Sequence, residues 1–248
     1  RAAAADEGKA PLVQWEEAAG AAREAGELLT IRHAKHVIQA AWHHKGDYLV
    51  TLSPAANTRA ILIHQVSKRQ TQNPFTKSKA DAQRVLFHPS KPFLFVASPR
   101  GVRVYSLLKQ AMVKSLTGGF KALSSFAVHP AGDNVICSAF DRRLSWFDMD
   151  LSTKPYRTMR YNNTGLRSVA FHPRLPLFAA GGEDGMVYVF HATVYADLLQ
   201  NPLIVPLKRL RAHRCDGCDG VVDLAFHPVQ PWLFTCGVDK TLRLFTEL

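Results

Sequence analysis

The sequence predicts an all-β fold made of repeats of about 40–45 residues. An apolar residue followed by His-Pro recurs at His88, His129, His172 and His227. Counted from the related His43, these histidines lie 45, 41, 43 and 55 residues apart. The later copies are followed by an aspartate that opens another apolar strand pattern, at Asp141, Asp184 and Asp239. Four short strands at this period are typical of the blades of a β-propeller.

The pattern within one repeat is clearest in residues 169–190. An apolar run ends at His172-Pro173, a second run follows, and Asp184-Gly185 turns into a third. Short apolar runs separated by Pro, Gly and Asp-Gly are typical of strands joined by hairpins. The repeat-equivalent histidines are therefore predicted to form the turn between the first and second strands. The aspartates are predicted to form the turn before the third strand, where a carboxylate accepts backbone amides.

The repeats predict about five blades within residues 31–248. The blade cores fall near 31–79, 80–121, 122–163, 164–213 and 214–248. Residues 1–30 are interpreted as an alanine-rich acidic linker or insertion that ends in a strand at 28–31, with another candidate strand at 12–15. The segment 191–207 lengthens one repeat, and a helical turn at 194–199 is predicted to stop at Asn201-Pro202. This segment is either a functional insertion or a passive loop. Residues 241–246 are the candidate for a closing strand.

The charge of the chain points to an anionic partner. The net charge is +11, but residues 1–30 hold six acids and three bases, so the remainder carries +14. Three windows, residues 48–80, 151–182 and 198–214, contain no acid but hold clusters of lysine and arginine. This pattern favours RNA phosphates over a merely solvated surface. Nearby aromatic residues are candidates for stacking on unpaired bases. The candidate RNA-binding residues are Lys68, Arg69, Lys77, Lys79, Lys154, Arg157, Arg160, Arg167, Lys208, Arg209 and Arg211.

Other chemistries find little support in the sequence. There is no apolar run long enough to cross a membrane and no signal peptide pattern, and the chain is expected to be the C-terminal part of a longer protein. The four cysteines have no disulfide framework spacing. His213, Cys215 and Cys218 form only half of a zinc motif, so no metal and no cofactor is predicted. The histidines and aspartates that could serve in catalysis recur at equivalent positions of the repeat, and no nucleophile–base set is visible elsewhere. The sequence therefore indicates a protein that is not an enzyme.

The repeat resembles that of the WD-repeat family, in which seven blades are usual. The resemblance implies that the missing blades lie upstream of residue 1, and the alternative is a five-bladed ring closed by this chain alone. The Trp-Asp dipeptide itself is degenerate here, with Trp146-Phe147-Asp148 nearest to it. Several segments outside the blade consensus resemble the C-terminal propeller of the block-of-proliferation family. They are residues 32–43, 46–49, 73–75, 129–137, 150–157 and 194–203. Together they extend the resemblance over essentially 31–248.

That resemblance implies a non-catalytic scaffold of the nucleolus and nucleus, acting in pre-ribosome assembly of the large ribosomal subunit. The implied partners are large-subunit pre-rRNA, a pescadillo-type protein and a WD-repeat protein with a ubiquitin-like domain, and the implied role is support of pre-rRNA processing. The alternative is a WD-repeat protein-recognition module, such as a substrate receptor or chromatin reader, without RNA binding.

Overall fold

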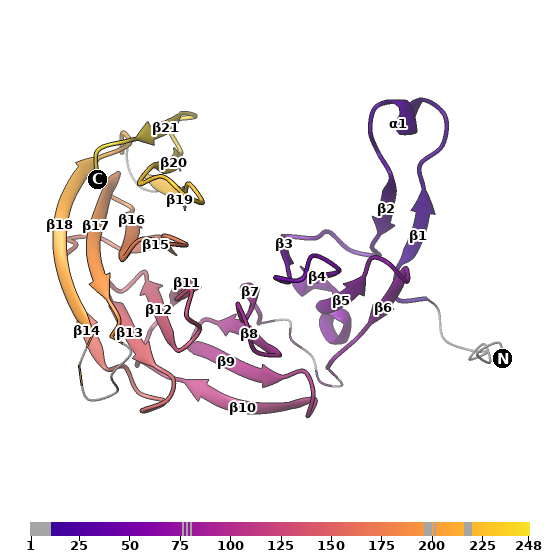
Figure 1. Cartoon of the computed structure of the whole chain (residues 1–248), viewed down its shortest axis with the longest axis horizontal. Helices are drawn as coiled ribbons and strands as arrows, with labels where there is room; N and C mark the ends of the chain where they lie inside the picture. Colours follow the sequence, from indigo (N-terminus) through magenta and orange to yellow (C-terminus); the bar gives the residue numbers. More distant parts are fainter. Residues whose placement is uncertain are drawn as a thin grey trace. The chain divides into compact units, whose positions relative to one another are not determined.

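The computed structural model describes residues 11–75, 77, 79, 81–195, 200, 202–215 and 220–248. The chain divides into two compact units, Arg1–Phe87 and His88–Leu248. Strands dominate both units, and the predicted all-β fold with five blade-like sheets is confirmed (Figure 1). Within the described ranges, no helix is both long and apolar enough to cross a membrane.

The first unit contains a hairpin and one blade. β1 (Gln14–Glu17) pairs antiparallel with β2 (Leu29–Arg32), and α1 (Ala21–Glu24) lies in the connection between them (Figure 1). The blade has the strand order β3 (Gln39–Trp42), β4 (Tyr48–Leu52), β5 (Ile61–Gln65) and β6 (Gln70–Gln72). The 3-10 helix η1 (Pro54–Arg59) joins β4 to β5. The division between the units follows β7 (Arg84–Phe87), inside the second predicted repeat.

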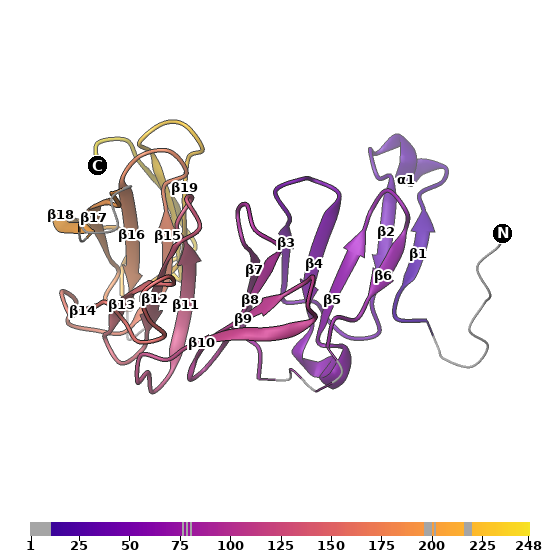
Figure 2. The ribbon, with the colours of Figure 1, turned by 60° about the horizontal axis from the view of Figure 1, so that its bottom comes forward.

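The second unit contains four further antiparallel sheets. The first holds β8 (Phe93–Ser98), β9 (Gly101–Ser106) and β10 (Ala111–Leu116). The next holds β11 (Leu123–Val128), β12 (Asn134–Ala139), β13 (Leu144–Asp148) and β14 (Arg157–Met159). Then come β15 (Leu166–Phe171), β16 (Leu177–Gly182), β17 (Met186–Thr193) and β18 (Leu203–Arg211). The last holds β19 (Val221–Phe226), β20 (Leu233–Gly237) and β21 (Leu242–Phe245), where β21 pairs with β20. The first strands of successive sheets, β11, β15 and β19, lie next to one another (Figure 2).

The apolar faces of neighbouring sheets form the core. Trp146 of β13, Phe178 of β16 and Phe190 of β17 are fully buried together. The Phe178 and Phe190 rings stack with their centroids 4.6 Å apart. The indole N–H of Trp146 donates to Asn134 Oδ1 at 2.7 Å, so its polar atom is satisfied. Large aromatic side chains thus supply the burial that holds consecutive blades together.

The histidines of the repeat lie in the turns between first and second strands. In each case the backbone N–H donates to the carbonyl five residues on, from His43 to Tyr48 through His227 to Trp232. The ring Nδ1 accepts backbone amides of the same turn, as at His172, where Arg174 and Leu175 donate at 3.0 and 2.9 Å. The imidazole therefore replaces backbone partners that the tight turn lacks.

The aspartates lie in the turns between second and third strands. Asp184 Oδ1 accepts the Met186 amide, and Asp239 Oδ1 accepts the Thr241 amide. Burial acts to raise the pKa of Asp239, but hydrogen bonds from Thr241 and His213 outweigh it and hold the pKa well below its ordinary value. Residues 196–199 and 201, where a helical turn was predicted, lie outside the described residues.

Candidate nucleic-acid interface

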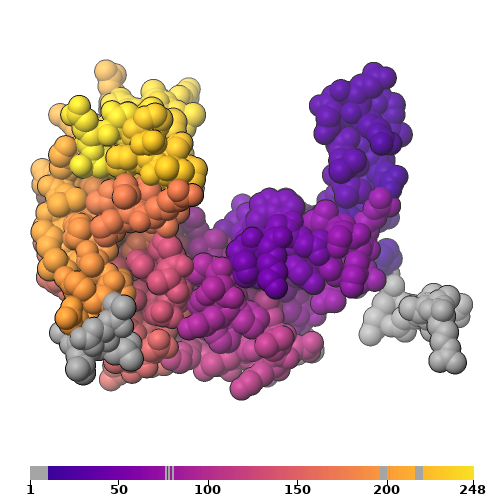
Figure 3. All heavy atoms as spheres, in the orientation of Figure 1, coloured from indigo at the N-terminus to yellow at the C-terminus, as the bar shows by residue number. Residues whose placement is uncertain are grey.

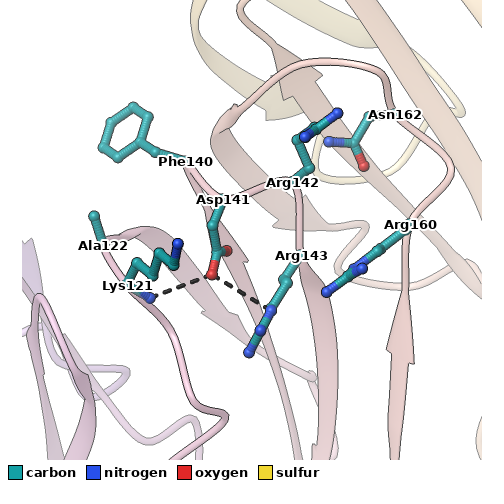
Figure 4. A pocket seen from close by; sticks show the side chains of 8 residues that line it. All are labelled: Lys121, Ala122, Phe140, Asp141, Arg142, Arg143, Arg160 and Asn162. Carbon is teal, nitrogen blue, oxygen red and sulfur yellow. Dashed lines mark hydrogen bonds and ion pairs between the residues drawn. The ribbon is translucent and has the colours of Figure 1, made fainter.

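A basic pocket of about 710 Å³ opens on the β11–β14 blade. Three connections build it: β10–β11, the turn between β12 and β13, and β14–β15. All three lie at the ends of the strands opposite to the His-Pro turns. The lining residues are Lys121, Ala122, Phe140, Asp141, Arg142, Arg143, Arg160 and Asn162 (Figure 4).

Four cations and one carboxylate line this basic pocket. Asp141 Oδ2 accepts the Lys121 amide at 3.2 Å and lies 3.4 Å from Arg143 Nε. Arg143 also donates to the carbonyls of Gly118 and Gly119, at 3.0 and 2.7 Å. The Arg143 guanidinium therefore stabilises the loops through its internal contacts. In the part of the chain that the structure describes, the Lys121 ammonium and the Arg160 guanidinium have neither a hydrogen-bond nor an ion-pair partner, and both residues are exposed.

Arg142 occupies a backbone position that disfavours a side chain. Its φ is 66°, in the left-handed region. The equivalent residue after Asp184 is Gly185, with φ 74°, and the one after Asp239 is Lys240, with φ 62°. A non-glycine residue there costs about 1–2 kcal/mol. The positive φ therefore belongs to this turn in all three repeats, and glycine is the residue that suits it best. Among the residues that the structure describes, the Arg142 guanidinium makes one long hydrogen bond, 3.4 Å to the Asn163 carbonyl.

An aromatic ring stands at the edge of the basic pocket. Phe140 is 41% exposed although it follows directly on the buried strand β12. The Arg167 guanidinium lies 5.6 Å from the centre of the ring, and Arg167 also pairs with Glu183 at 3.7 Å. Phe140 thus presents an open apolar surface among cations, while Arg167 is partly neutralised.

A second, smaller pocket lies on the neighbouring blade, and we call it the Tyr161 pocket. Its volume is about 230 Å³, and Tyr161, Tyr188, Val189, Phe190, Pro206, Leu207, Lys208 and Arg209 line it. Pro206 has no N–H to donate, and the register between β17 and β18 shifts at this point, which leaves Leu207 unpaired. Burial, with Asp184 nearby, raises the pKa of Tyr188 to about 12, and its hydroxyl donates to Asp184 Oδ2 at 3.0 Å.

The structure brings together only some of the candidate residues. Arg160 lines the basic pocket, while Lys208 and Arg209 line the Tyr161 pocket. Arg157 on β14 donates to the Ile204 carbonyl at 3.4 Å, and Lys208 donates to the Glu247 carbonyl at 3.0 Å. Lys154 and Arg211 are exposed outside both pockets.

The first-unit candidates are less available for a ligand. Arg69 forms an ion pair with Glu17, and its φ is 52°. Lys79 is only 9% exposed, and its ammonium lies 5.1 Å from the centre of the Phe75 ring. Lys68 and Lys77 are exposed. Reversing charge at all four positions would therefore disturb packing at Lys79 as well as surface potential.

Sequence reasoning missed Lys121, Arg142 and Arg143, which supply most of the basic pocket. Lys121 lies in a window whose acids, Asp133 and Asp141, hid it from a search for acid-free stretches. The available signal was the pair Arg142-Arg143 at a turn position where the next repeat has glycine. Convergence of three connections from separate hairpins could be seen only in the structure.

The half zinc motif has a structural explanation. His213 is 3% exposed, with Nδ1 2.9 Å from Asp239 Oδ1 and Nε2 2.9 Å from Thr235 Oγ1. Both ring nitrogens are thus engaged, and Cys218 lies outside the described residues. No group of three or more metal-ligating side chains occurs in the described ranges.

Sequence comparison with known proteins bears on the repeat and on the family. The WD domain, G-beta repeat model matches residues 153–191 and 204–246. Ribosome biogenesis protein bop1-A of Xenopus laevis is 54% identical over 94% of this chain and 32% of its own length. Ribosome biogenesis protein BOP1 of Homo sapiens is 54% identical over 94% of this chain and 31% of its own, and bop1 of Danio rerio is 53% identical over 97% and 31%.

The repeats, the blade-like sheets and the matched model define a WD40-repeat protein. Within that class the chain is homologous to the ribosome biogenesis proteins named BOP1, which confirms the resemblance to the block-of-proliferation family. The chain spans about a third of the length of these curated relatives.

Proposed function

We propose that this chain is a non-catalytic scaffold in the biogenesis of the large ribosomal subunit and that it binds pre-rRNA through the basic pocket. The observation that carries the proposal is 54% identity, over 94% of the chain, to proteins named for ribosome biogenesis. Lys121 and Arg160 are exposed cations without a partner among the described residues, and they support an anionic ligand. The proposal places the protein in the nucleolus, with a pescadillo-type protein and a WD-repeat protein carrying a ubiquitin-like domain as partners in pre-rRNA processing.

The test is UV crosslinking in cells followed by sequencing of the attached RNA. The protein should crosslink to large-subunit pre-rRNA, and the double variant Lys121→Gln/Arg160→Gln should crosslink much less. Lys109→Gln, an exposed lysine outside both pockets, is the matched control. Crosslinking at background level for the unmodified protein would refute RNA binding.

A second candidate function is recognition of a protein, including the WD-repeat partner. The edge strand β18 exposes Leu203, Val205 and Leu207, at 46%, 39% and 47%. The segment that contains β18 lies in the orange margin of the second unit (Figure 3). Alternate apolar residues on an exposed edge favour pairing with another chain. Partners that remain bound after RNase treatment and are lost with Val205→Lys would support this function.

A further inference from the structure

The two pockets of the second unit share one wall. Arg160 and Asn162 line the basic pocket, and Tyr161 between them lines the Tyr161 pocket. Consecutive residues of one short segment thus face two different recesses. A ligand that passes over this segment meets Arg160 on one side and Tyr161 on the other.

The Tyr161 pocket suits one planar ring. Its volume of about 230 Å³ is below the roughly 300–1,000 Å³ of pockets that hold drug-sized ligands. Tyr161 is anchored by Phe190, with the ring centroids 5.6 Å apart, and is still 42% exposed. The remaining lining is apolar or aromatic except for Lys208 and Arg209. A small apolar recess beside cations matches a nucleobase with its neighbouring phosphate.

The basic pocket has a complementary composition. Lys121, Arg142 and Arg160 supply positive charge, and Arg143 and Asp141 hold the loops that carry them (Figure 4). Arg143 and Arg160 extend in the same direction in this view. The larger volume of about 710 Å³ has room for a sugar–phosphate segment rather than a single ring.

We propose that the two pockets form one path for single-stranded RNA, with an unpaired base in the Tyr161 pocket and the adjoining phosphates in the basic pocket. This inference rests on the proposed function and names the form of RNA that is bound. Bases of a duplex are stacked and paired and cannot enter such a recess, whereas unpaired bases stack on exposed aromatic side chains. An acidic peptide would satisfy the cations but has no regular alternation of ring and charge.

The experiment measures binding of the full chain by fluorescence anisotropy. The probes are a labelled single-stranded RNA and the same strand annealed to its complement. Tyr161→Ala should weaken single-strand binding by about 5- to 150-fold, as loss of one stacked base does. Tyr161→Phe should bind like the unmodified chain, and duplex binding should be weaker and indifferent to both changes.

A second variant protects the test against misfolding, because Tyr161 packs on Phe190. Arg160→Gln should reduce the slope of log affinity against log salt by about 0.7, the value for one phosphate contact on a single strand. Lys109→Gln should leave that slope unchanged. Circular dichroism of each variant verifies folding, and if Tyr161→Ala is misfolded, the Arg160→Gln slope decides.

Three results would overturn the path. They are unchanged single-strand binding by folded Tyr161→Ala, an unchanged slope for Arg160→Gln, and equal affinity for the duplex. Competition by polyglutamate at the same charge concentration would instead indicate an acidic protein ligand. If pre-rRNA crosslinking in cells persists in Tyr161→Ala, the proposed path for single-stranded RNA is wrong, but the proposed function still holds. If the unmodified protein does not crosslink, both the path and the proposed binding of pre-rRNA are wrong.

Discussion

At the scale of single residues, the histidines of the repeat act as replacement backbone partners. His172 is 1% exposed and satisfies two amides through Nδ1, and its Nε2 donates to the Gln230 carbonyl of the next blade at 2.9 Å. His227 makes the same pair of turn contacts, to Val229 and Gln230, but is only half-buried. The two residues therefore separate the contribution of the turn from that of the contact between blades.

We expect His172→Ala to lower the free energy of unfolding by more than His227→Ala does. Each change leaves turn amides without their acceptor, and each unsatisfied buried group costs about 1–3 kcal/mol. His172→Ala also loses the bond to Gln230 and leaves a buried cavity. Urea denaturation followed by circular dichroism measures both values, and equal losses would show that the bond between blades contributes nothing.

At the scale of an element, the β3–β6 blade contains a buried histidine whose two ring nitrogens are both bonded to threonine hydroxyls. His64 on β5 is fully buried, with Nε2 2.8 Å from Thr51 Oγ1 and Nδ1 2.9 Å from Thr71 Oγ1. Trp15 of β1 donates to the same Thr71 hydroxyl at 3.1 Å, so the network joins the hairpin to the blade. Burial, with His33 nearby, lowers the pKa of His64 to about 4.

This depressed pKa predicts that the first unit loses stability in mild acid. The unfolded chain protonates His64 near pH 6.5, whereas the folded chain does so only near pH 4. Stability should therefore fall as the pH drops from about 6.5 to about 4, and the contribution of His64 should level off below that. His64→Gln should flatten this part of the profile, measured by denaturation at each pH. The exposed His44→Gln is the control, and a profile unaltered by His64→Gln would contradict the assignment.

At the scale of the whole molecule, the charge is uneven along the chain. The first 30 residues are acidic, and the remainder carries a net charge of +14. Such an excess gives any nucleic-acid binding a strong dependence on salt. The total excess says little about which cations bind, because several are already paired, as Arg32 with Glu16 and Lys91 with Asp133. The useful distinction is between paired and unpaired cations.

Arg142→Gly tests that distinction without a cost in folding. Glycine suits the left-handed position, as Gly185 does in the next blade, so the free energy of unfolding should be unchanged or higher by up to about 1 kcal/mol. The salt dependence of RNA affinity should nevertheless decrease by about 0.7 in slope. Thermal denaturation and salt titration measure the two effects. A destabilised variant, or an unaltered slope, would mean that Arg142 serves the fold.

The fold could be predicted from the sequence because the same local pattern of short apolar runs and histidine turns recurs in each repeat. Five turns, each closed by a bond from the histidine amide to the carbonyl five residues on, leave little freedom in the assignment of strands. The basic pocket could be predicted only at Arg160, because its other cations come from connections that are separate in sequence and meet through blade packing. The contact between the Lys79 ammonium and the Phe75 ring could not be predicted either, because composition does not reveal which lysine is buried.

The turns that carry the histidines also limit how such a sequence can change over evolutionary time. Each closes with a bond from the histidine amide to the carbonyl five residues on. A Cβ on Gly132 of one such turn would lie 2.3 Å from the ring of His88 in another. An insertion or deletion there would break a contact between repeats as well as the turn itself. The connections between third and fourth strands tolerate length variation, from residues 66–69 to 194–202. We therefore expect insertions to accumulate in the connections between third and fourth strands, while the histidine turns keep a constant length.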